Sequence, residues 1–167
     1  MRSEDSRTFA DFVRREQPAL LRLAVLLAGD RGHAEDLVQT ALLKTYRHWH
    51  RISAGGSPNA YVRRVLVTSH TSWRRRLWTT EQVTEVLPDR ADHVPDDPDQ
   101  DLRAALRALP PRMRTAVVLR YYADLSEQQA AEAMGCSPST VNTQTTRGLA
   151  RLRVLLAGPS LAREEIR

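Results

Sequence analysis

The chain has 167 residues, of which 41% are hydrophobic and 27% charged, as in soluble globular proteins. Its 25 Lys and Arg outnumber its 20 Asp and Glu, which gives a net charge of +5, and 24 of the 25 are arginine; this bias either favours contact with polyanions or reflects codon usage. The single cysteine, Cys136, excludes an intrachain disulfide and a cysteine-rich zinc site, and is typical of a reducing, cytoplasmic setting. We expect neither membrane insertion nor a secretory signal, because no apolar run approaches the ~18 residues that span a bilayer and none follows the polar first residues.

Charge is distributed unevenly along the chain. Residues 1–78 contain 14 basic and 7 acidic side chains, residues 79–101 one basic and eight acidic, and residues 102–167 ten basic and five acidic. The middle segment also contains Pro88, Pro95 and Pro98 and lacks a helical apolar period. We therefore expect an acidic, flexible linker at 79–101 between small domains at 1–78 and 102–158, followed by a tail at 159–167.

Helical apolar spacing runs through both basic segments, and alternating β patterns are absent, so we expect an all-α fold. In the first segment the spacing predicts helices at about 9–27, 33–51 and 58–77. Pro18 should break or kink the first helix near Glu16, and Gly29 should end it. Residues 53–58 are expected to form a loop, with Pro58 in the first turn of the third helix.

The second segment is predicted to form four further helices. They lie at about 102–109, from Met113 to Tyr121, at about 126–134 and at about 137–156. Ser126 with Gln129 should cap the third of these, Gly135 should end it, and Gly158 should end the last.

The stretch 125–141 has the pattern of a helix-turn-helix. Ala131 is small where the two helices would cross, Gly135 can take the left-handed turn, and Val141 would point back between the helices. The second helix would then present polar groups to base edges or phosphates; these are Ser139, Thr140, Asn142, Thr143, Gln144, Thr146 and Arg147, with Arg151 and Arg153 behind them. The alternative is an ordinary helical hairpin. Cys136, in the turn, is expected to be a small buried filler and not a redox sensor, because no second cysteine could resolve an oxidised form.

Two surfaces of the first segment are further candidates for binding. One face of helix 33–51 is either a partner surface or a solvated face; it carries Asp36, Gln39, Thr40 and Leu43. Helix 58–77 interleaves arginines with Tyr61 and Trp73, as in proteins that bind single-stranded or distorted nucleic acid. The alternative for these aromatic residues is core packing beneath solvated arginines.

Taken together, these pieces resemble one family, the group IV or extracytoplasmic-function bacterial sigma factors, over about residues 6–157. The resemblance is carried in order by Ala34–Gln39 with Tyr46–Trp49, by Tyr61–Arg76, and by Leu109–Arg112 with Val117–Tyr122 and the helix-turn-helix. It implies that residues 1–78 are sigma region 2 and residues 102–158 sigma region 4. It also implies a transcription initiation factor that binds core RNA polymerase and directs it to promoter DNA.

The resemblance implies roles for individual residues as well. Core RNA polymerase would be contacted by Asp36, Gln39, Thr40 and Leu43. The minus-ten element would be melted and recognised by Ser53, Gly55, Gly56, Ser57, Tyr61, Arg64, Thr68, Trp73, Arg74 and Arg75, with a flipped base held at the loop 53–57. The minus-thirty-five element would be bound by Ser139, Thr140, Asn142, Thr143, Thr146, Arg147 and Arg151. The acidic linker would thread the polymerase's RNA path, and an anti-sigma factor is a further candidate partner.

The sequence departs from the family pattern at four of these or neighbouring positions. Thr40 stands where an acidic residue is usual, Thr68 where an asparagine often contacts the flipped base, and Asn142 and Gln144 where basic residues are commoner. These departures leave the class intact and bear on the promoter sequence and the affinity.

Other classes of protein explain less of the chain. A stand-alone helix-turn-helix regulator would account for residues 102–157 but leave the arginine-rich helix and the Asp36–Gln39 face without a role, and an RNA-binding antiterminator suits the helix-turn-helix poorly. An enzyme is disfavoured because the five histidines are scattered and no glycine-rich phosphate loop is present. We expect no catalytic residues, no metal, no cofactor and no small-molecule substrate.

Overall fold

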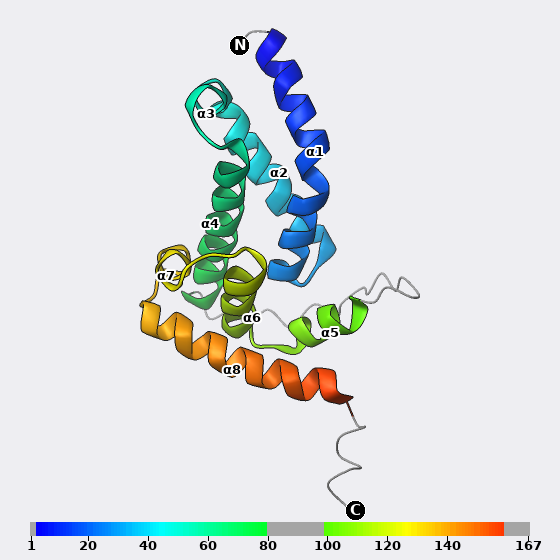
Figure 1. The fold of residues 1–167 in the computed structure, drawn as a ribbon, viewed down its shortest axis with the longest axis vertical. Helices are drawn as coiled ribbons and strands as arrows, with labels where there is room; N and C mark the ends of the chain where they lie inside the picture. Colours follow the sequence, from blue (N-terminus) through cyan, green and yellow to red (C-terminus); the bar gives the residue numbers. More distant parts are fainter. Residues whose placement is uncertain (1–2, 80–98, 159–167) are drawn as a thin grey trace, which may run out of the picture. The chain divides into compact units, whose positions relative to one another are not determined.

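The computed structural model describes residues 3–79 and 99–158, which belong to two compact units of the chain. All regular elements in these two ranges are helices, as the apolar spacing predicts (Figure 1). The predicted acidic linker, apart from its two ends, lies outside the described residues. Within the described ranges, no helix is both long and apolar enough to cross a membrane.

The first unit contains four helices. They are α1 (Ser3–Ala28), α2 (Arg31–Arg47), α3 (Trp49–Gly55) and α4 (Pro58–Thr79). Helix α2 packs against both α1 and α4, and the core between them contains Leu20, Leu23, Leu27, Val62 and Leu66, each buried. These residues recur at helical spacing, so each helix buries one stripe and leaves its opposite face in solvent.

Pro18 was predicted to break or kink the helix; α1 is continuous through Pro18, so of these two outcomes the break is wrong. A proline inside a helix leaves the carbonyl four residues earlier without its partner, and that residue, Arg14, is exposed as Pro18 is. Phe12 and Leu20, on either side of the proline, are both buried and hold the two halves of the helix against one core. The helix ends as predicted at Gly29, whose φ of 75° is left-handed and whose N–H donates to Val25 O at 2.8 Å.

The predicted helix at 33–51 is two helices, and most of the predicted loop after it is helical. Asp30 caps α2 by accepting from the backbone N–H of His33 at 2.8 Å, and α2 ends at Arg47. A new helix, α3, starts at Trp49 and runs to Gly55 because Trp49 and Ile52 both turn into the core. Only Gly56 and Ser57 therefore separate α3 from α4, so the predicted loop is wrong for residues 53–55, while Pro58 begins α4 as predicted.

The second unit contains α5 (Gln100–Ala108), α6 (Pro111–Val117), a π-helical turn η1 (Val118–Tyr122), α7 (Glu127–Met134) and α8 (Pro138–Ala157). Helix α8 packs against α5, α6 and α7. The core includes Leu106, Leu109, Leu119, Ala130 and Val141, all buried. The helix predicted from Met113 to Tyr121 is thus realised as α6 followed by η1, and α5 begins two residues before its predicted start.

Candidate nucleic-acid and partner interfaces

The exposed face of α2 brings together four of the predicted site residues. They are Asp36, Gln39, Thr40 and Leu43, which are three, four and seven residues apart and so share one side of the helix. Leu43 is 62% exposed, which is unusual for a leucine on a well-packed helix. An exposed apolar side chain among polar ones suits a surface that is covered by a partner.

Aromatic packing holds the C-terminal end of α2 against α1 and α3. Phe9 and Phe12 of α1 lie against Trp49, with ring centroids 5.2 and 5.1 Å away. The Trp49 Nε1 donates to the Thr8 hydroxyl at 3.0 Å, so the polar edge of the buried indole is satisfied. Helices α1, α2 and α3 are thereby tied together where α2 ends.

The outer face of α4 carries Tyr61, Arg64, Thr68 and Arg75, which lie on one side of the helix. Arg64, Thr68 and Arg75 are exposed and Tyr61 is half-buried. The Thr68 hydroxyl donates to the carbonyls of Arg64 and Val65, at 2.9 and 3.2 Å. Its proton is committed to the helix, which leaves its lone pairs for an outside donor.

The structure separates Trp73 and Arg74 from that outer face. The Trp73 ring packs on His33 of α2 with centroids 3.8 Å apart, and the Arg74 guanidinium lies 5.0 Å from the Trp73 ring centroid. Arg74 also reaches the Ala28 carbonyl at the end of α1, at 3.5 Å. Both side chains are half-buried. The arginine and aromatic residues predicted to bind nucleic acid along α4 therefore lie on two sides of the helix, with Trp73 and Arg74 on the inner side.

This packing shifts two protonation equilibria. Burial, followed by the positive charge of Arg74, lowers the pKa of His33, while Asp30 and Asp36 act in the opposite direction. Burial also lowers the pKa of Arg74. At neutral pH the cluster therefore holds one positive charge, on Arg74, over the Trp73 ring.

The junction of α3 and α4 exposes Ser53, Gly55, Gly56 and Ser57. The Ser57 side chain accepts from the Ala60 N–H at 3.3 Å and so caps the start of α4. Nothing lies within 4 Å of where a Gly55 Cβ would sit, so the junction leaves open space beside it.

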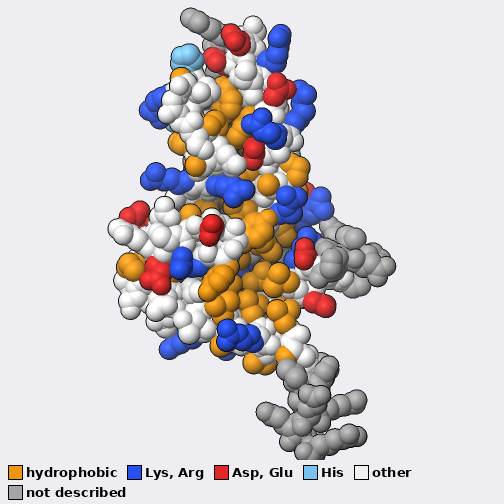
Figure 2. Space-filling model, in the orientation of Figure 1, with side chains coloured by type: hydrophobic (Ala, Val, Ile, Leu, Met, Phe, Trp, Pro, Cys, Tyr) orange, Lys and Arg blue, Asp and Glu red, His pale blue; other side chains and the backbone are white. Residues whose placement is uncertain are grey.

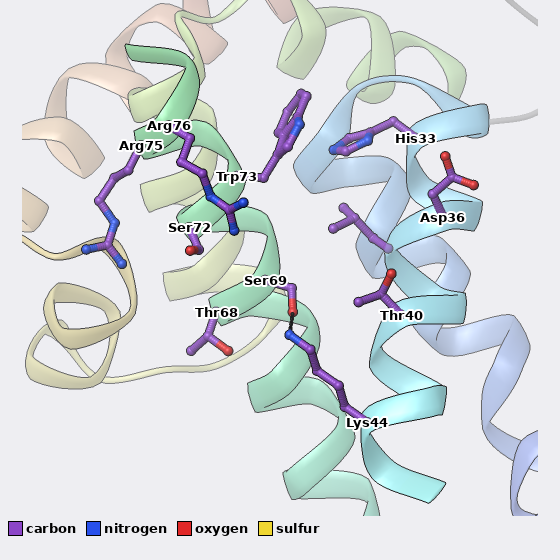
Figure 3. Close-up of a pocket in the computed structure, with 11 residues that line it drawn as sticks. His33, Asp36, Thr40, Lys44, Thr68, Ser69, Ser72, Trp73, Arg75 and Arg76 are labelled. Carbon is purple, nitrogen blue, oxygen red and sulfur yellow. Dashed lines mark hydrogen bonds between the residues drawn. The ribbon is translucent and has the colours of Figure 1, made fainter. Parts of the chain in front are cut away.

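A hollow of about 450 Å³ lies between α2 and α4 (Figure 3). Its cations are Lys44, Arg75 and Arg76, and its hydroxyl groups are those of Thr40, Thr68, Ser69 and Ser72. The Lys44 ammonium donates to the Ser69 hydroxyl at 3.4 Å. The sequence did not predict this hollow or a role for Ser69, because the hollow joins residues about 25 to 40 positions apart in the chain.

Helices α7 and α8 form the predicted helix-turn-helix. Ser126 and Gln129 make a reciprocal capping box, and Gly135 ends α7 with a left-handed φ of 66°. Ala131 and Val141 are buried, and the Cys136 N–H donates to the Ala131 carbonyl at 3.1 Å. Cys136 itself is half-buried in the turn.

The outer side of α8 presents most of the residues predicted to meet duplex DNA. Exposed side chains are those of Ser139, Asn142, Thr143, Thr146, Arg147 and Arg151. Thr140 differs from them: it is half-buried, and its hydroxyl and N–H both pair with the Ser137 hydroxyl, at 2.9 and 3.1 Å. Thr140 therefore belongs to the cap of α8 in this structure.

Gly148 is a contact residue that sequence reasoning missed. A Cβ at this position would lie 2.6 Å from Val117 Cγ2 and 3.4 Å from the Met113 carbonyl oxygen, so α8 crosses α6 at the glycine. The available signal was a glycine in the middle of a strongly helical segment, which marks a close approach.

The second unit exposes hydrophobic side chains on α5, on η1 and at the C-terminal end of α8, and Figure 2 shows part of this hydrophobic surface. They include Leu102, Val154, Leu155 and Leu156. Within residues 3–79 and 99–158, no group of three or more His, Cys, Asp or Glu side chains is placed to hold a metal ion.

Comparison with known proteins gives a consistent result for both units. Residues 12–80 match the family Sigma-70 region 2, and residues 99–152 match the family Sigma-70, region 4. The chain is 41% identical over 150 residues to the RNA polymerase sigma-E factor of Streptomyces avermitilis, covering 87% of this chain and 83% of the relative. It is 31% identical over 159 residues to the ECF RNA polymerase sigma factor SigE of Mycolicibacterium smegmatis, covering 88% and 61% respectively.

Among solved structures, the chain resembles the sigma factor RpoE of Bartonella quintana, which was crystallised with the anti-sigma factor NepR. The TM-score is 0.67 and the sequence identity 26%, and the match covers 91% of this chain and 98% of that one.

Proposed function

This chain belongs to the extracytoplasmic-function group of sigma-70 RNA polymerase sigma factors, and on that premise we propose how its surfaces divide the work of initiation. As a sigma factor it binds core RNA polymerase and directs it to promoter DNA. We assign region 2 to residues 1–78 and region 4 to residues 102–158, joined by the acidic linker 79–101, with residues 159–167 as a tail.

Core RNA polymerase binds the exposed face of α2 in this proposal. Gln39 and Leu43 form its centre, and Asp36 and Thr40 its edge toward α4. The exposure of Leu43 supports the assignment, because burying an apolar side chain on a partner is favourable only where the free protein leaves it in water.

The minus-ten element binds along the outer face of α4 and the α3–α4 junction. Arg64 and Arg75 would hold phosphates, and Tyr61 would stack on a base. The open space beside Gly55, with Ser53, Gly56 and Ser57, would admit a base flipped out of the duplex. Trp73 and Arg74 would act from the inner side, by fixing the end of α4 against α1 and α2.

The minus-thirty-five element binds the recognition helix α8. Asn142, Thr143 and Thr146 would meet base edges in the major groove, while Arg147 and Arg151 would hold base edges or phosphates. Ser139 would contact the backbone at the start of the helix, and Thr140 would keep that start capped.

Further parts of the proposal concern partners and setting. An anti-sigma factor would bind this chain and hold it inactive; a precedent for such a complex is the Bartonella quintana sigma factor RpoE, which was crystallised with NepR. We infer that the chain acts in the cytoplasm and has no catalytic site of its own, the chemistry belonging to the polymerase.

The observation that carries the proposal is that one chain leaves two unlike surfaces exposed, the α2 face with Leu43 and the hydroxyl- and arginine-bearing face of α8. A stand-alone regulator needs only the second. The test is reconstitution with core RNA polymerase, followed by co-elution and by transcription from a pooled promoter library. Co-elution with promoter-dependent transcripts is expected; binding to duplex DNA without any attachment to core enzyme would favour a stand-alone regulator.

A further inference from the structure

The hollow between α2 and α4 joins two surfaces that the proposed function treats separately. Thr40, at the edge of the proposed polymerase face, and Lys44 enter it from α2, and Ser69 and Arg76 enter it from α4. Figure 3 shows Lys44 and Arg76 extending toward its middle from opposite ends. Its volume of about 450 Å³ is of the size that accommodates one nucleotide unit of a strand.

The chemistry of the hollow suits an anion. Lys44, Arg75 and Arg76 line the hollow together with the hydroxyl groups of Thr40, Ser69 and Ser72, and cations beside hydroxyl groups are what binds phosphate oxygens. The Lys44 ammonium already donates to the Ser69 hydroxyl at 3.4 Å, which orients it into the hollow while leaving it two further protons to donate. Lys44 is exposed, so a ligand reaches it directly from solvent.

The aromatic wall of the hollow argues for a phosphate and not for a stacked base. Trp73 is already packed on His33 at 3.8 Å, and Arg74 lies 5.0 Å from its centroid. Asp36 is the one carboxylate among the lining residues, and Figure 3 shows it near His33, two helical turns along α2 from Lys44. The anion therefore belongs at the Lys44 end, where Thr40 and Ser69 supply the hydroxyls.

We propose that the Lys44 end of the hollow is a binding subsite for one phosphodiester of the melted promoter strand, with Lys44 as its cation. The strand that follows the outer face of α4 would pass over α2 at this point. Helix α2 then serves both partners: Gln39 and Leu43 face polymerase, and Lys44 faces DNA. This inference rests on the proposed function, since it places a strand on region 2.

The test uses holoenzyme reconstituted from core RNA polymerase and the full chain. Its probe is a labelled promoter fragment whose non-template strand is single-stranded across the minus-ten element. Lys44→Ala should weaken binding about fivefold and make the salt dependence of log K shallower by about 0.7, as expected for one lost contact to a single strand. Lys44→Arg should restore most of the affinity. Arg14→Ala, which removes an exposed charge on α1 outside the hollow, is the matched control and should leave both quantities unchanged.

A second measurement locates the phosphate. Replacing one linkage at a time by a neutral methylphosphonate should weaken wild-type binding at several positions. At the linkage that occupies the hollow, the same replacement should cost the Lys44→Ala holoenzyme nothing further, because the charge partner is already gone. Equal affinity and salt slope for Lys44→Ala and Arg14→Ala, or additive losses at every linkage, would overturn the subsite. A wild-type chain that never joins core enzyme would instead overturn the proposed function, and the subsite with it.

Discussion

Gly148 shows at the scale of one residue how two helices of the second unit come together. Its missing side chain leaves room for Val117, and an added Cβ would meet Val117 Cγ2 at 2.6 Å. Gly148→Ala should therefore destabilise the protein by about 1–3 kcal/mol, as overpacking of a well-filled core does. Urea unfolding followed by circular dichroism measures the change.

Gly55 supplies the control for that substitution. It is also helical, but nothing lies within 4 Å of its Cβ position. Gly55→Ala should raise stability by about 0.5 kcal/mol, since alanine loses less backbone freedom on folding. A Gly148→Ala protein as stable as wild type would show that α6 and α8 can separate at no cost.

His33 makes the stability of the first unit depend on pH. Its pKa in the folded protein lies below the ordinary 6.5, chiefly through burial and then through Arg74. The unfolded chain therefore binds the proton more readily, so the stability that neutral His33 contributes is complete above pH ~6.5 and is lost as the pH falls toward the folded pKa. His33→Gln should flatten the fall in melting temperature between pH 7 and 5.

Because His48 is exposed and lies outside the cluster, His48→Gln is the substitution control for this measurement. Identical pH profiles of the melting temperature for His33→Gln and the wild-type chain would show that the His33–Trp73–Arg74 cluster is not the source of the pH dependence.

At the scale of the element, local signals predicted structure well and non-local contacts decided the rest. The capping box at Ser126 and the left-handed Gly135 are set by neighbours in sequence, so the helix-turn-helix was predictable to within a residue. The split of α2 from α3 was not, because it depends on Trp49 turning into a pocket lined by Phe9 and Phe12, some 40 positions earlier. The side of α4 that Trp73 takes was not predictable for a similar reason: its partner, His33, lies on another helix.

The α2 face carries a prediction of its own. Leu43→Ala should weaken binding to core RNA polymerase about tenfold, the loss expected when a leucine in the middle of an interface is truncated. Because Leu43 is 62% exposed in the free chain, its thermal unfolding should be nearly unchanged. Titration of the labelled variant into core enzyme measures the affinity. A wild-type affinity would contradict the assignment of the polymerase contact to this face of α2.

At the scale of the whole molecule, two units divide the proposed tasks, so losses should separate. Arg147→Ala should reduce transcription from a cognate promoter several-fold by removing a contact to the duplex, while binding to core enzyme stays at the wild-type level. In the Leu43→Ala protein the primary defect should be in binding to core enzyme, and transcription should fall only as its consequence. Parallel transcription and core-binding assays on both variants check this, and a core-binding defect in Arg147→Ala would contradict the division.

The all-α fold class and the order of the segments could be predicted from the sequence, because helical apolar spacing and blocks of like charge are local properties of the chain. The hollow between α2 and α4 could not be predicted, since Lys44 and Ser69 meet only after the two helices pack. The roles assigned to the α2, α4 and α8 side chains stay predictions, and the structure adds which of them share a face.

Lysine occurs once in this chain, and its amine stands in the hollow. Apart from the α-amino group, an acylating reagent therefore has a single primary amine to modify. A fluorophore attached at Lys44 would report directly on that spot, and protection of the amine from acylation would act as a one-residue footprint of whatever fills the space.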